Sequence, residues 1–191
     1  MHYHLQTEHS YLGSMPIENS GLVQRCVLEI EGQLIERPFI QVYGKLCRQQ
    51  RNVGFFSNTS VGYHYSGQLA ASKPLTPALQ ELLDSVNATF ESDFNGILVN
   101  EYPDGEHCIG KHSDDETALS NKGVVCVSYG ASRKFRIRDK KTGKPVLDIP
   151  TESGSMLIMG GQFQREFTHE IPVEKKIKER RISFTFRKHL V

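Results

Sequence analysis

The chain has 191 residues, of which 38% are hydrophobic and 24% are charged, and its formal net charge is +1 at pH 7. This composition is typical of a folded globular domain and excludes a wholly disordered chain. The near-neutral charge excludes a protein that is basic overall, so a nucleic acid would have to be bound by a local basic patch.

Residues 1–37 are expected to form an N-terminal extension. Residues 1 to about 20 show no hydrophobic period and are expected to be partly disordered, whereas residues 23–40 are typical of one or two strands with a turn at Gly32. The chain begins without the basic start and apolar run of a signal peptide, and no stretch reaches the ~18 apolar residues of a membrane span. These features predict an intracellular protein, cytoplasmic or nuclear, with no membrane partner.

Two segments in the first half differ from the rest in composition. Residues 41–56 are basic and aromatic, and Lys45, Arg48 and Arg51 are candidates for contact with phosphate groups. Residues 57–68 are polar and rich in tyrosine, which is typical of a loop.

One helix is predicted in the middle of the chain, followed by a series of strands. Thr76 can cap the helix and Pro77 suits its first turn. The apolar residues that recur at helical spacing are Leu79, Leu82, Leu83, Val86 and Phe90. The stretches rich in Val, Ile and Phe that are typical of strands are 94–102, 124–129, 134–138, 145–149, 155–159, 165–171 and 181–186. This order predicts a mostly β sandwich or barrel with supporting helices, and a jelly roll has enough strands.

The last predicted strand, RISFTFR, has two different faces. Side chains alternate along a strand, so Ile182, Phe184 and Phe186 share an apolar face. Arg181, Ser183, Thr185 and Arg187 share the other face, with the two arginines about 20 Å apart along the backbone. Two guanidinium groups and two hydroxyls facing inward would suit a small dianion, whereas facing outward they would form an ordinary solvated surface.

A second stretch, NEYPDGEHCIGKHSDDE at 100–116, contains a candidate metal site. In extended backbone His112 and Asp114 lie on one face and can hold one ion together. His169 follows inside another predicted strand. Two histidines and one carboxylate can form the facial triad of non-haem Fe(II) enzymes, which leaves open positions for a bidentate ligand and O₂. A dianion that chelates iron would in turn need cations nearby, which the two-arginine strand supplies.

These motifs resemble those of the AlkB family of Fe(II)- and 2-oxoglutarate-dependent dioxygenases, closest to the branch that repairs alkylated bases in duplex DNA. The resemblance covers about residues 38–189, within an expected dioxygenase domain of residues 38–191. The stretches that carry it are VYGK (42–45), YHYSG (63–67), NEYPDG and IGKHSDDE (100–116), SYGASRKFRIR (128–138), GSMLIMGG (154–161), His169 and RISFTFRK (181–188). It implies a double-stranded β-helix, or jelly roll.

The resemblance also implies the roles of the site residues. His112, Asp114 and His169 would ligate iron. Arg181 would bind the distal carboxylate of 2-oxoglutarate, while Arg187 would support the end that chelates the metal. Asn100 would act beside Arg187, and Tyr102 and Thr185 would complete the polar cradle. The reaction would be oxidative removal of the methyl group from 1-methyladenine or 3-methylcytosine, with release of formaldehyde, succinate and CO₂.

Substrate contacts are implied in the same way, within a nucleotide-recognition lid at about 41–67. Val42, Tyr43 and Gly44 would form a hydrophobic wedge that fills the gap left in the duplex, although relatives usually carry phenylalanine where Tyr43 stands. Tyr65 would stack on the base that leaves the duplex, and Tyr63 would shape the same wall. The acidic residues Asp115 and Glu116 would favour a cationic base, and Arg133, Lys134 and Arg136 could add a second basic patch.

Four functions are compatible with the sequence. The first is a DNA dealkylase that acts as a monomer on alkylated DNA, and the second is an RNA demethylase with the same site. The third is a protein or small-molecule hydroxylase of the same fold, which would not need the aromatic and basic segment 41–67. The fourth, a non-catalytic binding module, is disfavoured because all three metal ligands and both arginines are present.

Overall fold

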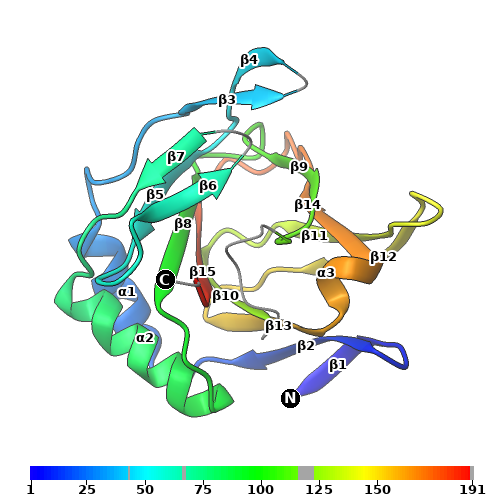
Figure 1. The fold of residues 1–191 in the computed structure, drawn as a ribbon, viewed down its shortest axis with the longest axis horizontal. Helices are drawn as coiled ribbons and strands as arrows, with labels where there is room; N and C mark the ends of the chain where they lie inside the picture. The colour runs from blue at the N-terminus through cyan, green and yellow to red at the C-terminus, as the bar shows by residue number, and fades with distance from the viewer. Residues whose placement is uncertain (43, 66–67, 116–122, 190–191) are drawn as a thin grey trace.

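The computed structural model describes residues 1–42, 44–65, 68–115 and 123–189, and it gives only the backbone of residues 42, 63–65 and 68–70. Two antiparallel sheets form its centre (Figure 1). The larger sheet has seven strands, in the order β1 (His2–Gln6), β2 (Ser10–Pro16), β13 (Ser155–Gly161), β10 (Val124–Gly130), β15 (Arg181–Arg187), β8 (Gly96–Tyr102) and β5 (Asn52–Phe56).

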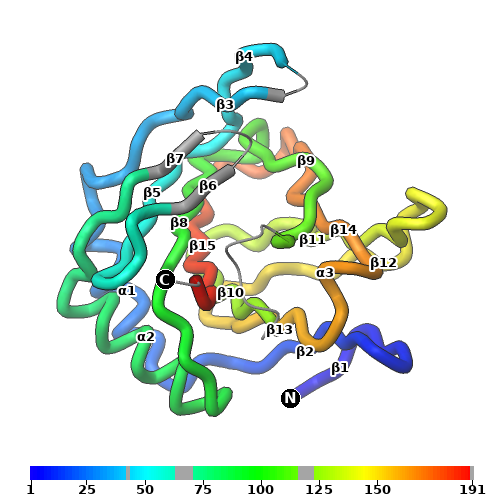
Figure 2. The backbone as a smooth tube through the Cα atoms, in the orientation of Figure 1, coloured from blue at the N-terminus to red at the C-terminus, as the bar shows by residue number. Residues whose placement is uncertain are grey.

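The smaller sheet has four strands, and two separate hairpins complete the described strands. Its order is β12 (Pro145–Pro150), β11 (Lys134–Asp139), β14 (Phe167–Ile171) and β9 (Ile109–His112). The hairpins are β3 (Phe39–Val42) with β4 (Lys45–Arg48), and β6 (Gly62–Tyr65) with β7 (Gln68–Ala71). Figure 2 shows the β3–β4 hairpin at the edge of the molecule, away from the centres of the sheets.

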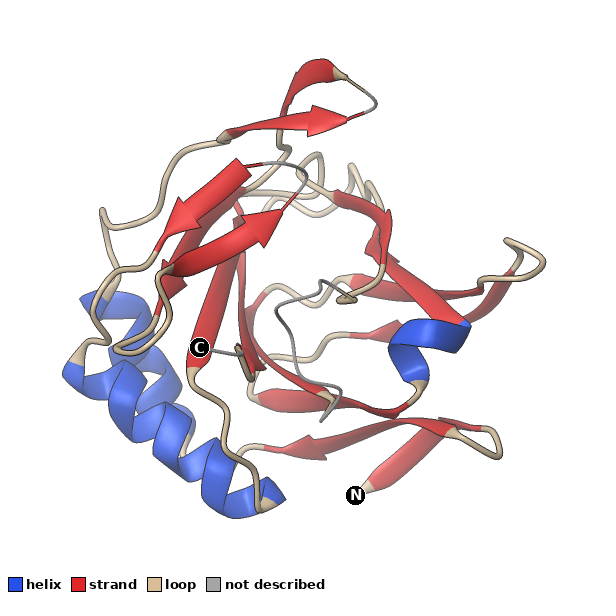
Figure 3. Cartoon of the chain, in the orientation of Figure 1, coloured by secondary structure: helices blue, strands red, loops and turns tan. Residues whose placement is uncertain are grey.

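Two long helices cover one face of the larger sheet (Figure 3). α1 spans Ser20–Glu29 and α2 spans Pro77–Phe90, whereas α3 is a single turn at Phe163–Glu166. As predicted, Thr76 caps α2, because its hydroxyl accepts a hydrogen bond from the backbone N–H of Leu79. The buried apolar faces of α1 and α2 and the apolar face of β15 share one core cluster.

The orientation of β15 decides which side of the larger sheet carries the site. Its apolar side chains Ile182, Phe184 and Phe186 are buried against the helices. Because side chains alternate along a strand, its polar face must then point away from the helices. That face lines a cavity that is also lined by residues of β9, β11 and β14 in the smaller sheet. The polar face of RISFTFR is therefore internal, with Arg181 and Arg187 both buried.

The N-terminal segment differs from its expected structure. Residues 2–6 and 10–16 are strands, because their backbone groups pair at the edge of the larger sheet, where β2 lies beside β13. Residues 20–29, most of which were expected in a strand, form α1. The residues that α1 buries are Leu22, Val23, Cys26 and Val27, a helical spacing that the β-branched valines obscure in the sequence.

Part of the tyrosine-rich segment is also more regular than a loop. Residues 62–65 and 68–71 pair as the hairpin β6–β7, because an extended partner satisfies backbone groups that a loop would leave to water. The predicted fold class, mostly β with supporting helices around a jelly roll, is confirmed. Within the described residues, no helix is both long and apolar enough to cross a bilayer.

Candidate metal and cosubstrate site

The three candidate metal ligands meet at the open edge of the smaller sheet. His112 ends β9 and lies directly opposite His169 of β14 in the strand register. Asp114 follows two residues later, and the candidate ligand atoms of the three residues all lie within 4.8 Å of one another. The Nε2 atom of His112 is 3.8 Å from Oδ1 of Asp114, and the Nε2 atom of His169 is 3.7 Å from Oδ2. The chain thus brings together the three residues expected from its sequence.

Burial sets the charge of these groups. Removal from water and, next in size, the nearby His112 lower the pKa of His169 to about 3, against the opposing effect of Asp114. Burial also lowers the pKa of His112. For Asp114 burial alone would raise the pKa, but Arg187 and the two histidines outweigh it and hold that pKa below its usual value. Neutral imidazoles and an ionised carboxylate are the forms that bind a divalent metal.

Neighbouring groups orient the imidazole rings of His112 and His169 for metal binding. Nδ1 of His112 donates to the carbonyl oxygen of Gly110 at 2.9 Å, which leaves Nε2 as the nitrogen that faces Asp114. The ring of His169 stacks on Phe135, with centroids 5.2 Å apart. Its buried Nδ1 has no hydrogen-bond partner among the described residues. The donor set, two imidazole nitrogens and one carboxylate, fits the facial triad of non-haem Fe(II).

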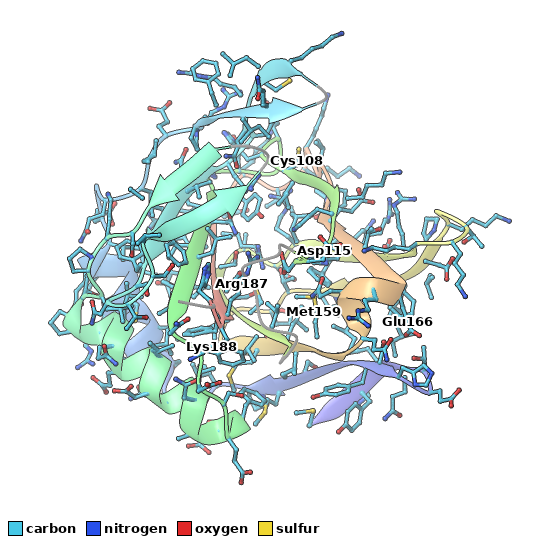
Figure 4. The ribbon with its side chains drawn as sticks, in the orientation of Figure 1. Cys108, Asp115, Met159, Glu166, Arg187 and Lys188 are labelled. Carbon is cyan, nitrogen blue, oxygen red and sulfur yellow. The ribbon has the colours of Figure 1, made fainter. Side chains whose placement is uncertain are left out.

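A cradle of polar groups lies beside the triad on the larger sheet. Arg187 donates from Nη2 to Oδ1 of Asp114 at 2.6 Å. Arg181 donates from Nη2 to the hydroxyl of Ser128 at 3.0 Å, and its guanidinium lies 5.4 Å from the ring centroid of Tyr102. Figure 4 shows Arg187 near the middle of the molecule, beside β15.

The other expected cosubstrate residues line the same cavity. Asn100 accepts a hydrogen bond at its Oδ1 from Nε of Arg51, at 2.8 Å. The hydroxyl of Thr185 lies 3.8 Å from Sγ of Cys126, within range of a weak hydrogen bond to sulfur. Every residue that was expected to bind the metal or 2-oxoglutarate therefore lines one cavity.

Two arginines that were expected at the surface are buried. Arg51, expected at phosphate groups, is only 4% exposed and lines the cavity. Arg133, expected in a surface patch, is 1% exposed and donates to the backbone carbonyls of Asp104, His107 and Pro172. Both expectations are wrong, because the side chains are drawn inward by acceptors that come from distant segments.

The remaining basic candidates lie at the surface. Arg136 makes a bidentate ion pair with Asp148, at 2.8 Å for each bond, and Nζ of Lys134 lies 3.6 Å from the same carboxylate. Lys45 and Arg48 are exposed on β4, where the guanidinium of Arg48 lies 5.2 Å from the ring centroid of Phe39. These two residues remain available for a partner, whereas Arg136 already has a counterion.

The predicted substrate residues are placed only in part. Tyr43 and Glu116 lie outside the described residues, and Val42, Tyr63 and Tyr65 are placed by their backbone, in β3 and β6. Gly44 forms the turn between β3 and β4 with a φ of +76°, a conformation that glycine adopts without strain. The side chain of Asp115 is 58% exposed and pairs with Nζ of Lys140 at 3.0 Å.

Together, the fold and the site define a jelly-roll protein with a two-histidine, one-carboxylate metal centre next to a cationic pocket. A family model described as the 2OG-Fe(II) oxygenase superfamily matches residues 13–187. The chain therefore belongs to this superfamily.

Individual relatives agree with that assignment and with the resemblance to AlkB enzymes. The human "DNA oxidative demethylase ALKBH2" is 34% identical over 160 residues, which cover 80% of this chain and 61% of the relative. The rat "Alpha-ketoglutarate-dependent dioxygenase alkB homolog 3" is 34% identical over 120 residues, 58% of this chain and 41% of the relative. The chain thus spans less than two thirds of the length of these relatives.

A solved structure supports the fold. The protein described as "The structure of OsALKBH1" superposes with a TM-score of 0.65 over 96% of this chain and 100% of that chain, at 18% sequence identity. At that identity the likeness concerns the arrangement of the strands, not the substrate.

Proposed function

We propose that this protein is an Fe(II)- and 2-oxoglutarate-dependent dioxygenase that removes N-alkyl groups from bases of DNA. The observation that carries the proposal is the placement of the His112–Asp114–His169 group and the guanidinium groups of Arg181 and Arg187 around one cavity. The superfamily implies both the metal and the cosubstrate, and the residues present suit each of them.

The cationic pocket suits the two carboxylates of 2-oxoglutarate. A guanidinium can engage a carboxylate through two parallel hydrogen bonds, which a lysine cannot do. Arg181 would bind the distal carboxylate, since its buried Nε has no hydrogen-bond partner among the described residues. Arg187 and Asn100 would support the end of the cosubstrate that chelates the metal, and Tyr102 and Thr185 would line the pocket between them.

The bound iron would supply the oxidative chemistry that converts 2-oxoglutarate and O₂ to succinate and CO₂ and hydroxylates an N-methyl group, which then leaves as formaldehyde. The chain would supply binding, orientation and exclusion of water. His112, Asp114 and His169 would hold the metal in a fixed geometry. Leu98, Ile109, Phe135 and Ile171 line the same cavity with apolar surface, which limits the access of water to the reacting groups.

Substrate recognition would depend on the two hairpins near the cavity, since a base has to leave the stack to reach a buried metal. We assign Val42, at the end of β3, and Gly44, in the turn before β4, to the wedge together with Tyr43. Tyr63 and Tyr65, in β6, would contact the extruded base. Asp115 and Glu116 would favour a cationic lesion such as 1-methyladenine or 3-methylcytosine.

The functional unit that we propose is a monomer whose catalytic domain comprises residues 38–191, with the recognition lid at about 41–67. All residues assigned above fall within this range. β1 and β2 form one edge of the large sheet and α1 packs on its outer face, so these elements would support the domain.

The proposal is tested by measuring formaldehyde release with Fe(II) and 2-oxoglutarate. One oligonucleotide sequence containing 1-methyladenine would be supplied as single-stranded DNA, as duplex DNA and as RNA, with the unmethylated strand and the His112→Ala variant as controls. We expect the unsubstituted enzyme to release formaldehyde from the methylated DNA. Neither the unmethylated strand nor the His112→Ala variant should give formaldehyde. Faster release from RNA would instead support an RNA demethylase with the same site.

Silence on all three substrates would contradict the dealkylase proposal. If succinate were still formed slowly without a nucleic acid, the dioxygenase assignment would stand and the substrate would be a protein or a small molecule. If neither product formed, although the metal and 2-oxoglutarate were bound, the assignment as an active dioxygenase would fail.

A further inference from the structure

The segment that carries Asp114 is not held by the strand ladder. β9 ends at His112, so the carboxylate that would bind the metal lies on irregular backbone. Irregular segments keep a geometry only where side chains or backbone groups elsewhere fix them. The position of Asp114 relative to His169 therefore depends on contacts that residues 113–115 make with other parts of the fold.

Those contacts converge on α3 and on the strand that follows it. The hydroxyl of Ser113 donates to the carbonyl oxygen of Phe167 at 2.9 Å. The backbone N–H of Asp114 donates to Oε1 of Gln164 at 2.8 Å. Phe167 begins β14, the strand that carries His169, so the same short stretch of chain holds two of the three candidate ligands.

Gln164 is itself oriented by its neighbours. Its Nε2 lies 3.5 Å from Sδ of Met159, a residue that is only 2% exposed, and donates to it. With the amide nitrogen on this side, the amide oxygen faces the N–H of Asp114, so the two ends of the amide are not interchangeable. Figure 4 shows Met159 and Asp115 close to the middle of the molecule, on the side of α3.

Lys140 closes the arrangement from the outside. Its Nζ donates to the carbonyl oxygen of Gln164 at 2.7 Å and to Oδ2 of Asp115 at 3.0 Å. Its backbone N–H donates to the carbonyl oxygen of Glu166 at 2.9 Å. Lys140 thus links α3 to the residue that follows the metal-binding carboxylate.

Asp114 also has a contact on its other side, with Arg187 of the larger sheet, which pulls against the contact with Gln164. Arg187 donates to Oδ1 of Asp114 from the larger sheet, so its positive charge attracts this carboxylate. If the backbone of Asp114 were not fixed, the carboxylate could move toward Arg187 and away from the histidines. The contact with Gln164 resists that movement from the smaller sheet.

We propose that Gln164 is a positioning residue that holds Asp114 beside His169 for metal binding, with Lys140 as its support. This inference rests on the proposed metal site. Because metal affinity depends on groups that orient the ligands, substitution of such a group typically lowers it by about 10–100-fold. Gln164 would act on the metal only through the backbone of Asp114, without touching it.

The test is calorimetric titration of the metal-free, full-length protein with Mn(II) in the absence of 2-oxoglutarate. Gln164→Leu keeps the bulk of the side chain but removes the acceptor, and we expect its Kd for Mn(II) to rise by about 10–100-fold. Gln164→Glu retains an acceptor oxygen, and its affinity should stay within about threefold of the unsubstituted protein if the hydrogen bond is the cause. Gln162→Ala is the matched control, because Gln162 is an exposed glutamine two residues away, and it should bind Mn(II) normally.

Two further measurements make the outcome decisive. The melting temperature of the metal-free Gln164→Leu variant should be close to that of the unsubstituted protein. The visible spectrum of the Co(II)-loaded variant should differ from that of the Co(II)-loaded unsubstituted protein. If Gln164→Leu does not fold, Lys140→Met takes its place. Its expected loss of affinity is smaller, about threefold to tenfold, since Lys140 contacts Gln164 and Asp115 but not Asp114. Unchanged Mn(II) affinity in the folded variant, or an equal loss in Gln164→Glu, would overturn the inference. Failure of the unsubstituted protein to bind Mn(II) would instead overturn the metal site itself.

Discussion

Arg187 donates a hydrogen bond of 2.6 Å to Asp114, one of the three candidate metal ligands. Arg187 ends β15 of the larger sheet, whereas Asp114 follows β9 of the smaller sheet. Both side chains are almost fully buried, at 4% and 2% exposure. A buried ion pair is costly to break by removing one partner, because the other charge is left without compensation. Arg187 therefore links the cosubstrate pocket to the metal site, and its substitution should affect both.

We expect Arg187→Ala to raise the concentration of 2-oxoglutarate required for turnover by orders of magnitude. Loss of a buried, charge-assisted pair typically costs about 2–5 kcal/mol, and 1.4 kcal/mol corresponds to about tenfold in affinity. The measurement is anaerobic titration of the Mn(II)-loaded protein with 2-oxoglutarate. Lys188→Ala is the control, because Lys188 is the adjacent cation but pairs with Asp93, and its variant should bind the cosubstrate normally.

An unchanged 2-oxoglutarate requirement in Arg187→Ala would mean that the cosubstrate is held elsewhere in the cavity. Arg187→Lys distinguishes charge from shape, since lysine keeps the charge but not the planar fork of donors. We expect this variant to recover only part of the lost affinity.

We expect His112→Ala to abolish iron-dependent turnover without unfolding the chain. Its imidazole lies at the end of β9, so the substitution removes a ligand but leaves the pairing of β9 with β14 in place. Turnover and circular dichroism of the same preparation check the two parts of this prediction. Retained activity would remove His112 from the metal site, and a lost fold would leave Mn(II) binding by His169→Ala as the second test.

The alternation of residues 181–187 explains why so much of the site could be predicted. In a strand with one apolar face, burial of Phe184 and Phe186 determines where Arg181 and Arg187 must point. The strand itself could be recognised from local composition, and the triad from a short motif followed by a histidine. The direction of the polar face, inward or outward, depended on the second sheet and was not determined by local pattern.

The residues that sequence reasoning missed depend on long-range pairing. Arg51 reaches Asn100 because β5 lies beside β8, with Val53 opposite Asn100, a register that no local signal encodes. Gln164 reaches Asp114 from a single helical turn. Such contacts bring together segments far apart in sequence, so composition and periodicity do not identify them.

Arg51 provides the next prediction. Its Nε donates to Oδ1 of Asn100, so the amide nitrogen of Asn100 is the end left for a ligand in the cavity. We expect Arg51→Met to weaken 2-oxoglutarate binding by about tenfold, the effect of losing one charged hydrogen bond. Arg48→Met is the matched control, because Arg48 is an exposed arginine of β4. Equal effects of the two substitutions on 2-oxoglutarate affinity would contradict the assignment of Arg51 to the cavity.

A prediction about stability concerns the contact between α1 and α2. The carboxylate of Glu29, at the end of α1, accepts a hydrogen bond of 2.9 Å from the backbone N–H of Ala78, in the first turn of α2. We expect Glu29→Ala to lower the free energy of unfolding by about 1 kcal/mol, since it removes a helix-capping acceptor. Urea denaturation measures the change, and Mn(II) and 2-oxoglutarate affinities should not differ from those of the unsubstituted protein. A change in either affinity would show that the helices influence the site through the sheet.

The final prediction is a loss of stability on acidification of the metal-free protein. Burial and, after it, the charge of Arg187 lower the pKa of His189 to about 4, while burial and His112 lower that of His169 to about 3. Below pH 6.5, the usual value for histidine, the unfolded chain therefore binds protons that the folded chain does not. Stability is then full above about pH 6.5 and falls as the pH decreases toward 4.

His189→Phe isolates one of these groups. Phenylalanine preserves a ring beside Phe55, whose centroid lies 4.8 Å from that of His189, but it cannot take up a proton. Each pKa unit corresponds to about 1.4 kcal/mol, so the free energy lost between pH 6.5 and 4 should be smaller in this variant by up to about 3 kcal/mol. Urea denaturation at several pH values, in the presence of a chelator, gives the pH dependence of the free energy of unfolding for the variant and for the unsubstituted protein. Parallel pH profiles for the two proteins would mean that His189 takes up its proton equally well in the folded state, and the acid sensitivity would then have to come from the metal ligands.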